Sequence, residues 1–240
     1  GGALRTEDYS WAFTTAIPGL SSIDPADKDT SVSTASLAQV EVGFTAPIDA
    51  VQAIADNFVL LRNGQSVSLR GNDPVDLGSN KYGLAPAEGW DVGSTYTVQI
   101  APVVSGPLGG GQTISRQFQT AVPSMLAQTP VAGVSDVAIS ASQIRVDFDD
   151  AVDAGAVSLA NIELLAEGEP VSISEPLYDA TDLSVSFAPA AGILRAGTSY
   201  HVRLSAALGG ALRTEDYSWA FTTAIPGLSS INPADKDTGV

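Results

Sequence analysis

Residues 217–223 read Tyr-Ser-Trp-Ala-Phe-Thr-Thr, a pattern typical of a β-strand. Its large apolar side chains occupy every second position. In an extended strand successive side chains point to opposite faces, so Tyr217, Trp219 and Phe221 share one face. Residues 9–15 repeat the same letters. Half-buried strands of this kind predict an all-β chain with these aromatic rings in its core.

The same alternation recurs upstream, in pairs of segments 104 residues apart. Residues 40–44 and 144–148 form one pair of predicted strands, and residues 96–100 and 200–204 form another. Turn-forming dipeptides lie between the strands, among them Asn63-Gly64 and Glu167-Gly168. Short strands at regular spacing predict β-sandwiches of about seven strands each. Helical turns are expected only at residues 50–56 and 154–159.

The chain also repeats itself over a longer distance. Residues 209–240 copy residues 1–32 with two differences, Asn232 for Asp24 and Gly239 for Ser31, so the period is 208 residues. Each period holds two homologous modules of about 104 residues, a length that buries a core without disulfides. We expect the chain to be part of a longer protein. The predicted division is residues 1–17 (last strands of a preceding module), 18–121, 122–225 and 226–240 (opening strand of the next module).

Proline marks each predicted junction, at Pro18, Pro123 and Pro226. Short junctions with proline are stiffer than Gly/Ser linkers, so the modules are expected to form an elongated rod. The modules at the two ends, residues 1–17 and 226–240, are incomplete. We expect their strand edges to pair with neighbouring repeats, either along one filament or between molecules.

Composition excludes several classes of partner. The chain carries 27 acidic and 11 basic residues, a net charge of −16, and no cysteine. Nucleic acids and anionic lipids are recognised by clustered Lys and Arg, so neither is an expected partner. The chain contains no run of 18 apolar residues, which argues against membrane insertion of this segment.

Catalytic chemistry finds little support in the residues. His201 is the only histidine, and it alternates with apolar neighbours on a predicted strand, so its side chain is expected to face solvent. Nucleophilic catalysis needs a base beside its nucleophile, and zinc sites need several Cys or His ligands. Gly109-Gly110-Gly111 is read as a hairpin turn and not as a phosphate loop. We therefore expect no enzyme, and no cofactor other than a candidate calcium ion.

Acidic residues near turns raise the question of calcium. Asp27 and Asp29 lie near the opening of one module, and Asp149 and Asp150 follow a strand of the next. Ca²⁺ is bound by six to eight oxygens, often from closely spaced Asp residues. These four residues are the candidate ligands. The alternative, which needs no metal, is that they are solvated turn residues.

Aromatic residues suggest one further candidate. The stripe of Tyr217, Trp219 and Phe221 is expected to be core and not a sugar platform. Trp90 lies in a predicted loop where the second module has Ile193. It either caps the end of its sandwich or packs against the next module, and an exposed Trp90 would suggest ligand binding.

Four sequence motifs resemble those of bacterial immunoglobulin-like tandem repeats, the type found in S-layer proteins and large surface adhesins. They are a Pro-led opening strand at 18–25, a Phe-led turn at 44–49 and 148–153, a Gly-x-x-Tyr-x-Val strand at 93–98 and 197–202, and the closing strand at 9–15 and 217–223. Residues 115–120 depart from the closing motif. The resemblance implies seven-stranded Greek-key sandwiches that act as extracellular spacers without catalysis.

Three functions remain open on these grounds. The leading one is a stalk or fibre spacer of a long extracellular or bacterial cell-surface protein, in adhesion or in a surface filament. The second is a module that binds glycan or protein through loops, with residues 76–82 and Trp90 as the place to look. The third is an accessory region attached to an extracellular enzyme.

Overall fold

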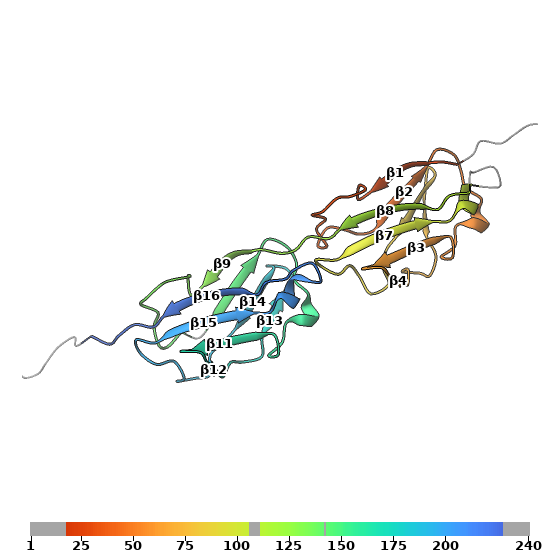
Figure 1. The fold of residues 1–240 in the computed structure, drawn as a ribbon. Helices are drawn as coiled ribbons and strands as arrows, with labels where there is room; N and C mark the ends of the chain where they lie inside the picture. Colours follow the sequence, from red (N-terminus) through yellow and green to blue (C-terminus); the bar gives the residue numbers. More distant parts are fainter. Residues whose placement is uncertain (1–17, 106–110, 142, 228–240) are drawn as a thin grey trace, which may run out of the picture. The chain divides into compact units, whose positions relative to one another are not determined.

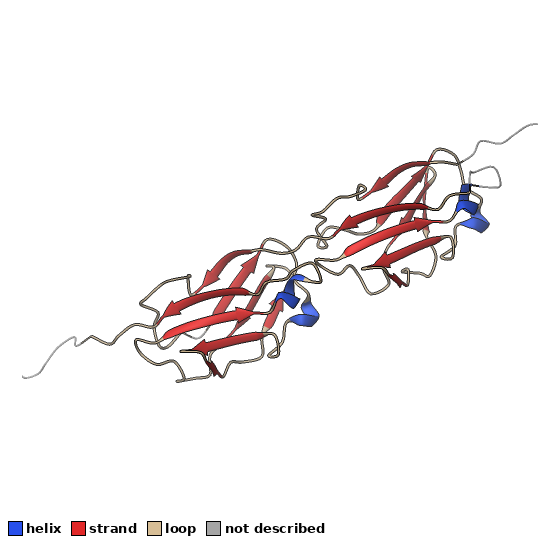
Figure 2. Ribbon diagram, viewed as in Figure 1, coloured by secondary structure: helices blue, strands red, loops and turns tan. Residues whose placement is uncertain are grey.

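The computed structural model describes residues 18–105, 111–141 and 143–227. In this part the chain folds into four antiparallel four-stranded sheets, two in each of two β-sandwiches (Figure 1). Figure 2 shows that strands dominate both sandwiches and that helix is confined to single turns. The predicted all-β class is confirmed. The strands expected in residues 1–17 and the opening strand expected in 226–240 lie outside the described residues, apart from Pro226 and Gly227.

The first sandwich contains strands β1 to β8. One sheet has the order β1-β2-β6-β5 and the other β4-β3-β7-β8. The bounds of the first sheet are β1 Leu20–Asp24, β2 Val40–Phe44, β6 Lys81–Leu84 and β5 Val75–Gly78. Those of the second are β4 Gln65–Val67, β3 Phe58–Arg62, β7 Thr95–Ile100 and β8 Ile114–Gln119.

The second sandwich repeats this topology strand for strand, with sheets β9-β10-β14-β13 and β12-β11-β15-β16. The bounds of the first sheet are β9 Met125–Thr129, β10 Ile144–Phe148, β14 Ser184–Phe187 and β13 Leu177–Asp179. Those of the second are β12 Glu169–Val171, β11 Ile162–Ala166, β15 Ser199–Leu204 and β16 Tyr217–Thr222. In each sandwich the two sheets match the ABED and CFG sheets of an immunoglobulin domain, with one strand added beside C.

The added strand makes eight strands per sandwich where about seven were expected. It is the short partner of a hairpin, β4 after β3 and β12 after β11. The turn residues have left-handed backbones, with φ of 49° and 82° at Asn63-Gly64 and 53° and 92° at Glu167-Gly168. Two consecutive residues with positive φ form the turn that matches the twist of a tight hairpin. The dipeptides predicted as turns therefore create the extra strand.

The opening segment of each sandwich joins both sheets. β1 pairs with β2, and β9 with β10. Beyond a cis proline (Pro25 or Pro130), the chain crosses to the other sheet. There Val32 forms a parallel bridge with Thr120, and Val137 with Thr223. One continuous segment thus holds the two sheets together at one end of the sandwich.

The core consists of the side chains that the alternation placed inward. On β16, Tyr217, Trp219 and Phe221 are buried while Ser218 is exposed, as predicted. The ring of Phe221 stacks on Tyr200 at a centroid distance of 5.5 Å, and in the first sandwich Phe118 stacks on Tyr96 at 5.6 Å. Such aromatic pairs add about 0.5–1.5 kcal/mol beyond their burial.

The two predicted helical turns are confirmed as single 3₁₀ turns, η1 (Ala50–Gln52) and η3 (Ala154–Ala156). The carboxylates of Asp49 and Asp153 cap them by accepting from the amides of Val51 and Gly155. Two further turns, η2 (Pro102–Ser105) and η4 (Ala206–Gly209), follow β7 and β15. A search of the described residues finds no helix whose length and apolar character suit a membrane span.

Candidate functional site

The Gly-x-x-Tyr motif builds a hydrogen-bonded corner at the start of β7 and β15. The hydroxyl of Tyr96 accepts from the amide of Asp91 at 2.9 Å, and that of Tyr200 from the amide of Arg195 at 2.8 Å. Both tyrosines are almost completely buried. This is the tyrosine corner of immunoglobulin sandwiches, in which the phenol fixes the connection that leads into strand F.

A buried threonine of the closing strand completes the same corner in the second sandwich. The hydroxyl of Thr223 accepts from the amide of Thr198 at 3.0 Å and donates to the carbonyl of Arg195. The side chain is inaccessible to solvent. The Thr-Thr ending of the motif therefore has a structural use, because it ties the last strand to the connection before β15.

The first sandwich builds the same contacts with Thr120. Its hydroxyl accepts from the amide of Ser94 at 2.8 Å and donates to the carbonyl of Asp91 at 2.7 Å. Sequence reasoning recognised these motifs as strands and missed the hydrogen bonds. The signal available for them was the recurrence of Tyr and Thr at the same places in both modules.

The first pair of candidate calcium ligands lies beside the opening segment of the first sandwich. The carboxylate of Asp27 accepts from the amide of Gln117 at 2.9 Å, across to the edge of β8. The carboxylate of Asp29 accepts from the amide of Ser31 at 3.3 Å. Both are exposed, and each satisfies a backbone donor at a turn or sheet edge, the ordinary use of Asp in such places.

The second pair follows β10. The carboxylate of Asp149 accepts from the amide of Ser124 at 2.6 Å, and Asp150 accepts from the amide of Ala151 at 2.7 Å. Across residues 18–105, 111–141 and 143–227, no three His, Asp or Glu side chains gather in a way that suits a metal ion. Calcium binding by Asp27, Asp29, Asp149 or Asp150 stays a prediction.

Trp90 packs inside its own sandwich. Its ring contacts Tyr96 edge-on at a centroid distance of 4.8 Å and Phe118 at 5.8 Å. The side chain is half-buried. It therefore caps the aromatic core, as one of the sequence interpretations expected. The two tyrosine corners align Asp91 with Arg195, so Trp90 corresponds to the buried Leu194 and not to Ile193. His201 is exposed on β15, as expected for a solvent-facing position.

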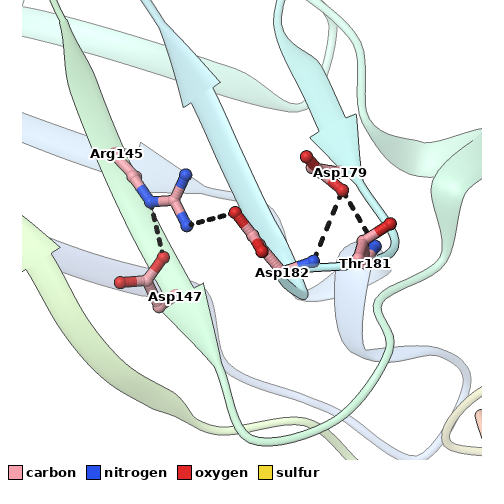
Figure 3. Close-up of polar contacts among 5 residues, drawn as sticks. All are labelled: Arg145, Asp147, Asp179, Thr181 and Asp182. Atoms are coloured by element: carbon pink, nitrogen blue, oxygen red, sulfur yellow. Dashed lines mark hydrogen bonds and ion pairs between the residues drawn. The ribbon is translucent and has the colours of Figure 1, made fainter.

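A charged cluster that the sequence did not reveal lies on β10 and the β13–β14 turn of the second sandwich (Figure 3). The guanidinium of Arg145 lies 2.7 Å from Asp147 and 3.5 Å from Asp182. Its pKa is raised, chiefly by the hydrogen bond to Asp147. The members of this cluster are solvated, and exposed ion pairs contribute little stability.

The turn in the same cluster is held by Asp179. Its carboxylate accepts from the amides of Thr181 at 2.8 Å and Asp182 at 3.3 Å, and these backbone hydrogen bonds lower its pKa. An Asp that bonds to the backbone two residues on forms an Asx turn. The cluster thus shapes a hairpin and assembles no pair of groups suited to proton transfer.

One concavity of the second sandwich measures about 410 Å³. Its lining is of mixed character, with acidic, basic and aliphatic side chains around the backbone of β12: Ala166, Glu167, Glu169, Pro170, Val171, Ser172, Ile193, Arg195, Thr198 and Tyr200. Ligand pockets are normally apolar with a few convergent polar groups. This surface does not have that character.

Comparison with known proteins bears on the fold. A family model described as "Bacterial Ig-like domain" matches residues 14–117 and again 119–223. Among solved structures, the N-terminal part of the bacterial S-layer protein SbsC is 20% identical with a TM-score of 0.30, over 86% of this chain and 44% of that one. The LD transpeptidase LdtMt1 is 17% identical with a TM-score of 0.32, over 85% of this chain and 74% of that one.

The tandem Ig repeats of Dlar are 12% identical with a TM-score of 0.27, over 88% of this chain and all of that one. This chain spans less than half the length of the SbsC fragment. No curated protein matches the sequence. The two consecutive family matches, together covering most of the chain, agree with the two sandwiches of identical topology. The chain therefore belongs to the bacterial Ig-like domain family and carries two copies of the domain in tandem.

Proposed function

We propose that this chain is a non-catalytic spacer of an extracellular or cell-surface protein, in which modules in series add length and stiffness. The observation that carries the proposal is the repetition itself. Thirty of the first 32 residues recur 208 positions later. A repeat whose copies differ so little is one whose number can change without loss of its role, which suits a spacer.

The polar groups of the modules support this proposal. The tyrosines and threonines shared by both sandwiches, Tyr96, Tyr200, Thr120 and Thr223, form hydrogen bonds within their own sandwich. The candidate acidic residues satisfy backbone amides. Polar side chains that stabilise the fold, and do not point to a ligand, are those expected of a structural module.

The net charge of −16 agrees with a surface that stays soluble and resists self-aggregation when many modules lie in series. We propose that its partners are neighbouring repeats of the same protein. Self-assembly into a filament is the further form that such contacts would take.

The experiment that tests the spacer role is small-angle X-ray scattering on chains with one, two and three periods of 208 residues. Strands rise about 3.3 Å per residue, so each sandwich is on the order of 30 Å long and each period should add about 60 Å to the maximum dimension. Growth with the cube root of mass would contradict the proposal. Binding of the same chains on a glycan array would favour a recognition module instead.

A further inference from the structure

One end of the second sandwich presents a group of exposed aliphatic side chains. It is the end where β9 and β16 stop and where β10 and β15 begin, and we call it the closing end. Ile225 is 81% exposed and Val131 65%, and Ile139 and Ile193 are also exposed. Aliphatic residues scattered singly over a surface are ordinary, whereas several at one end of a domain could form an interaction surface.

Backbone hydrogen bonds fix the segment that carries Ile225 to the body of the sandwich. The amide of Ala224 donates to Val137 at 2.8 Å, and the amide of Gly197 donates to Ala224 at 3.2 Å. The side chain of Ile225 lies over Gly197, 3.0 Å from where a Cβ of that residue would stand. The backbone before Ile225 is thus fixed, and its side chain is still open to solvent.

The fold itself does not require these aliphatic residues. The cis prolines and the parallel bridges align the two sandwiches residue by residue at this end. In that alignment Val131 and Ile139 correspond to Ala26 and Thr34 of the first sandwich. The same topology is therefore built with small or polar residues at these positions, so the apolar character of the second sandwich serves another purpose.

The first sandwich has an exposed aliphatic group at its opposite end, where β1 begins. This opening end lies around η1 and η2 (Figure 1). Val51 is 68% exposed, and Ile54 and Val103 are also exposed. The matching positions of the second sandwich hold Gly155, Ser158 and Ala207, although Leu159, 48% exposed, and Leu212, 37% exposed, lie nearby.

Residues 226–240 repeat residues 18–32 with two differences, so we expect the chain after Ile225 to open another copy of the first sandwich. We propose that the closing end of the second sandwich docks on the opening end of this following copy. The contact joins Val131, Ile139, Ile193 and Ile225 to Val51, Ile54 and Val103. The inference rests on the proposed spacer role, because it requires modules in series.

Charge at the two ends is mixed and does not drive the pairing. The closing end carries an exposed Arg195, where the first sandwich has Asp91, and the opening end carries the exposed carboxylates of Asp49 and Asp56. The exposed Asp136, Glu167 and Glu169 also lie at the closing end, where the two glutamates line the same concavity as Arg195, and they oppose this attraction. The apolar residues therefore supply the contact.

Cysteine trapping tests the contact, because the native chain has no cysteine. The full chain is extended by appending residues 33–240 after Val240, which continues the period without a foreign linker. Val131→Cys is paired with Val51→Cys of the second copy, and Ile225→Cys with Val103→Cys of the second copy. The control pairs Leu126→Cys, 69% exposed at the start of β9, with the same Val51→Cys. At least one of these two pairs, which join the closing end to the opening end, should form a disulfide about tenfold faster than the control pair. Equal rates would overturn the proposed docking.

Thermal melting gives an independent reading. In the extended chain the second sandwich followed by a first-sandwich copy should melt about 4–8 °C higher than in the 240-residue chain. Val131→Ser with Ile139→Ser should abolish this gain and leave the shorter chain unchanged, since both side chains are exposed. Equal melting temperatures in the two chain lengths overturn the docking. The scattering series would still report a lengthening chain in that case, so failure of the contact is distinguishable from failure of the spacer role.

Discussion

The hydroxyl of Tyr200 accepts a 2.8 Å hydrogen bond from the amide of Arg195, five residues earlier in the chain. Tyr96 and Asp91 repeat the contact in the first sandwich at 2.9 Å. The phenol reaches back from a core strand to fix the connection that precedes it. This connection carries Ile193 and Arg195 to the closing end, so its rigidity bears on both stability and docking.

Tyr200→Phe should destabilise the second sandwich by about 1–3 kcal/mol. The ring keeps its stacking on Phe221, but the partly buried amide of Arg195 loses its acceptor, and an unsatisfied buried donor carries that cost. Urea unfolding monitored by tryptophan fluorescence measures the change. Tyr96→Phe is the matched variant and should act on the first sandwich alone. Wild-type stability in both variants would show that water replaces the phenol freely.

Thr223→Val tests the threonine that completes the corner. Valine has the same shape but lacks the hydroxyl that accepts from Thr198 and donates to Arg195. Because the site is inaccessible to solvent, the loss should be about 1–3 kcal/mol. Thr222→Val, one residue earlier and only partly buried, is the control and should change stability by less than about 0.5 kcal/mol. Equal effects at the two positions would contradict the assignment.

The sequence allowed the fold to be predicted to the level of individual strands. Alternation identified β2, β7, β10, β15 and β16, because a sandwich core demands inward side chains at every second position. It could not show the hydrogen bonds of Tyr96, Tyr200, Thr120 and Thr223, since those contacts are made with the irregular connections that precede β7 and β15.

The features that the sequence did not predict, the strands β4 and β12 and the ion pair of Arg145 with Asp182, depend on contacts between segments far apart or on exposed residues. The short strands β4 and β12 are exposed for most of their length and carry no apolar alternation that would reveal them. Arg145 and Asp182 are 37 residues apart in sequence, so only the pairing of β10 with β14 brings them together. The only feature of the sequence that indicated a function was therefore its repetition.

Alkaline pH should destabilise the second sandwich through Tyr217. Burial raises the pKa of its phenol from 10.0 to about 12, and the hydroxyl donates to the carbonyl of Pro123 at 2.7 Å. The unfolded chain releases this proton first. Stability from the neutral phenol is therefore complete below pH 10 and is lost as pH rises toward 12, by up to about 1.4 kcal/mol per pH unit.

Urea midpoints of the wild type and Tyr217→Phe across this pH range measure the effect. The wild type should lose stability more steeply than the variant. The pKa values of Tyr82 and Tyr178 are also raised, but both tyrosines are present in both chains and cancel in the comparison. Parallel pH profiles would show that Tyr217 does not titrate differently in the folded state.

Calcium binding is checked by melting the chain with Ca²⁺ and with a chelator. The carboxylates of Asp27, Asp29, Asp149 and Asp150 each accept from a backbone amide, and no three His, Asp or Glu side chains of the described residues are arranged to hold a metal ion. We therefore expect melting temperatures within about 1 °C of each other. A clear rise with Ca²⁺ that Asp149→Asn or Asp27→Asn abolishes would instead establish a calcium site.

Exchange of one turn residue between the sandwiches should move stability in opposite directions. The β11–β12 hairpin places Glu167 at φ of 53°, where the β3–β4 hairpin has Asn63 at 49°. Left-handed backbone costs most L-residues about 1–2 kcal/mol, and Asn tolerates it best after Gly. Glu167→Asn should therefore stabilise the second sandwich by about 0.5–1 kcal/mol, and Asn63→Glu should destabilise the first by a similar amount. Urea midpoints measure both changes. Because both sites are exposed, a loss of stability from Glu167→Asn would mean that the Glu167 side chain makes contacts that outweigh the backbone preference.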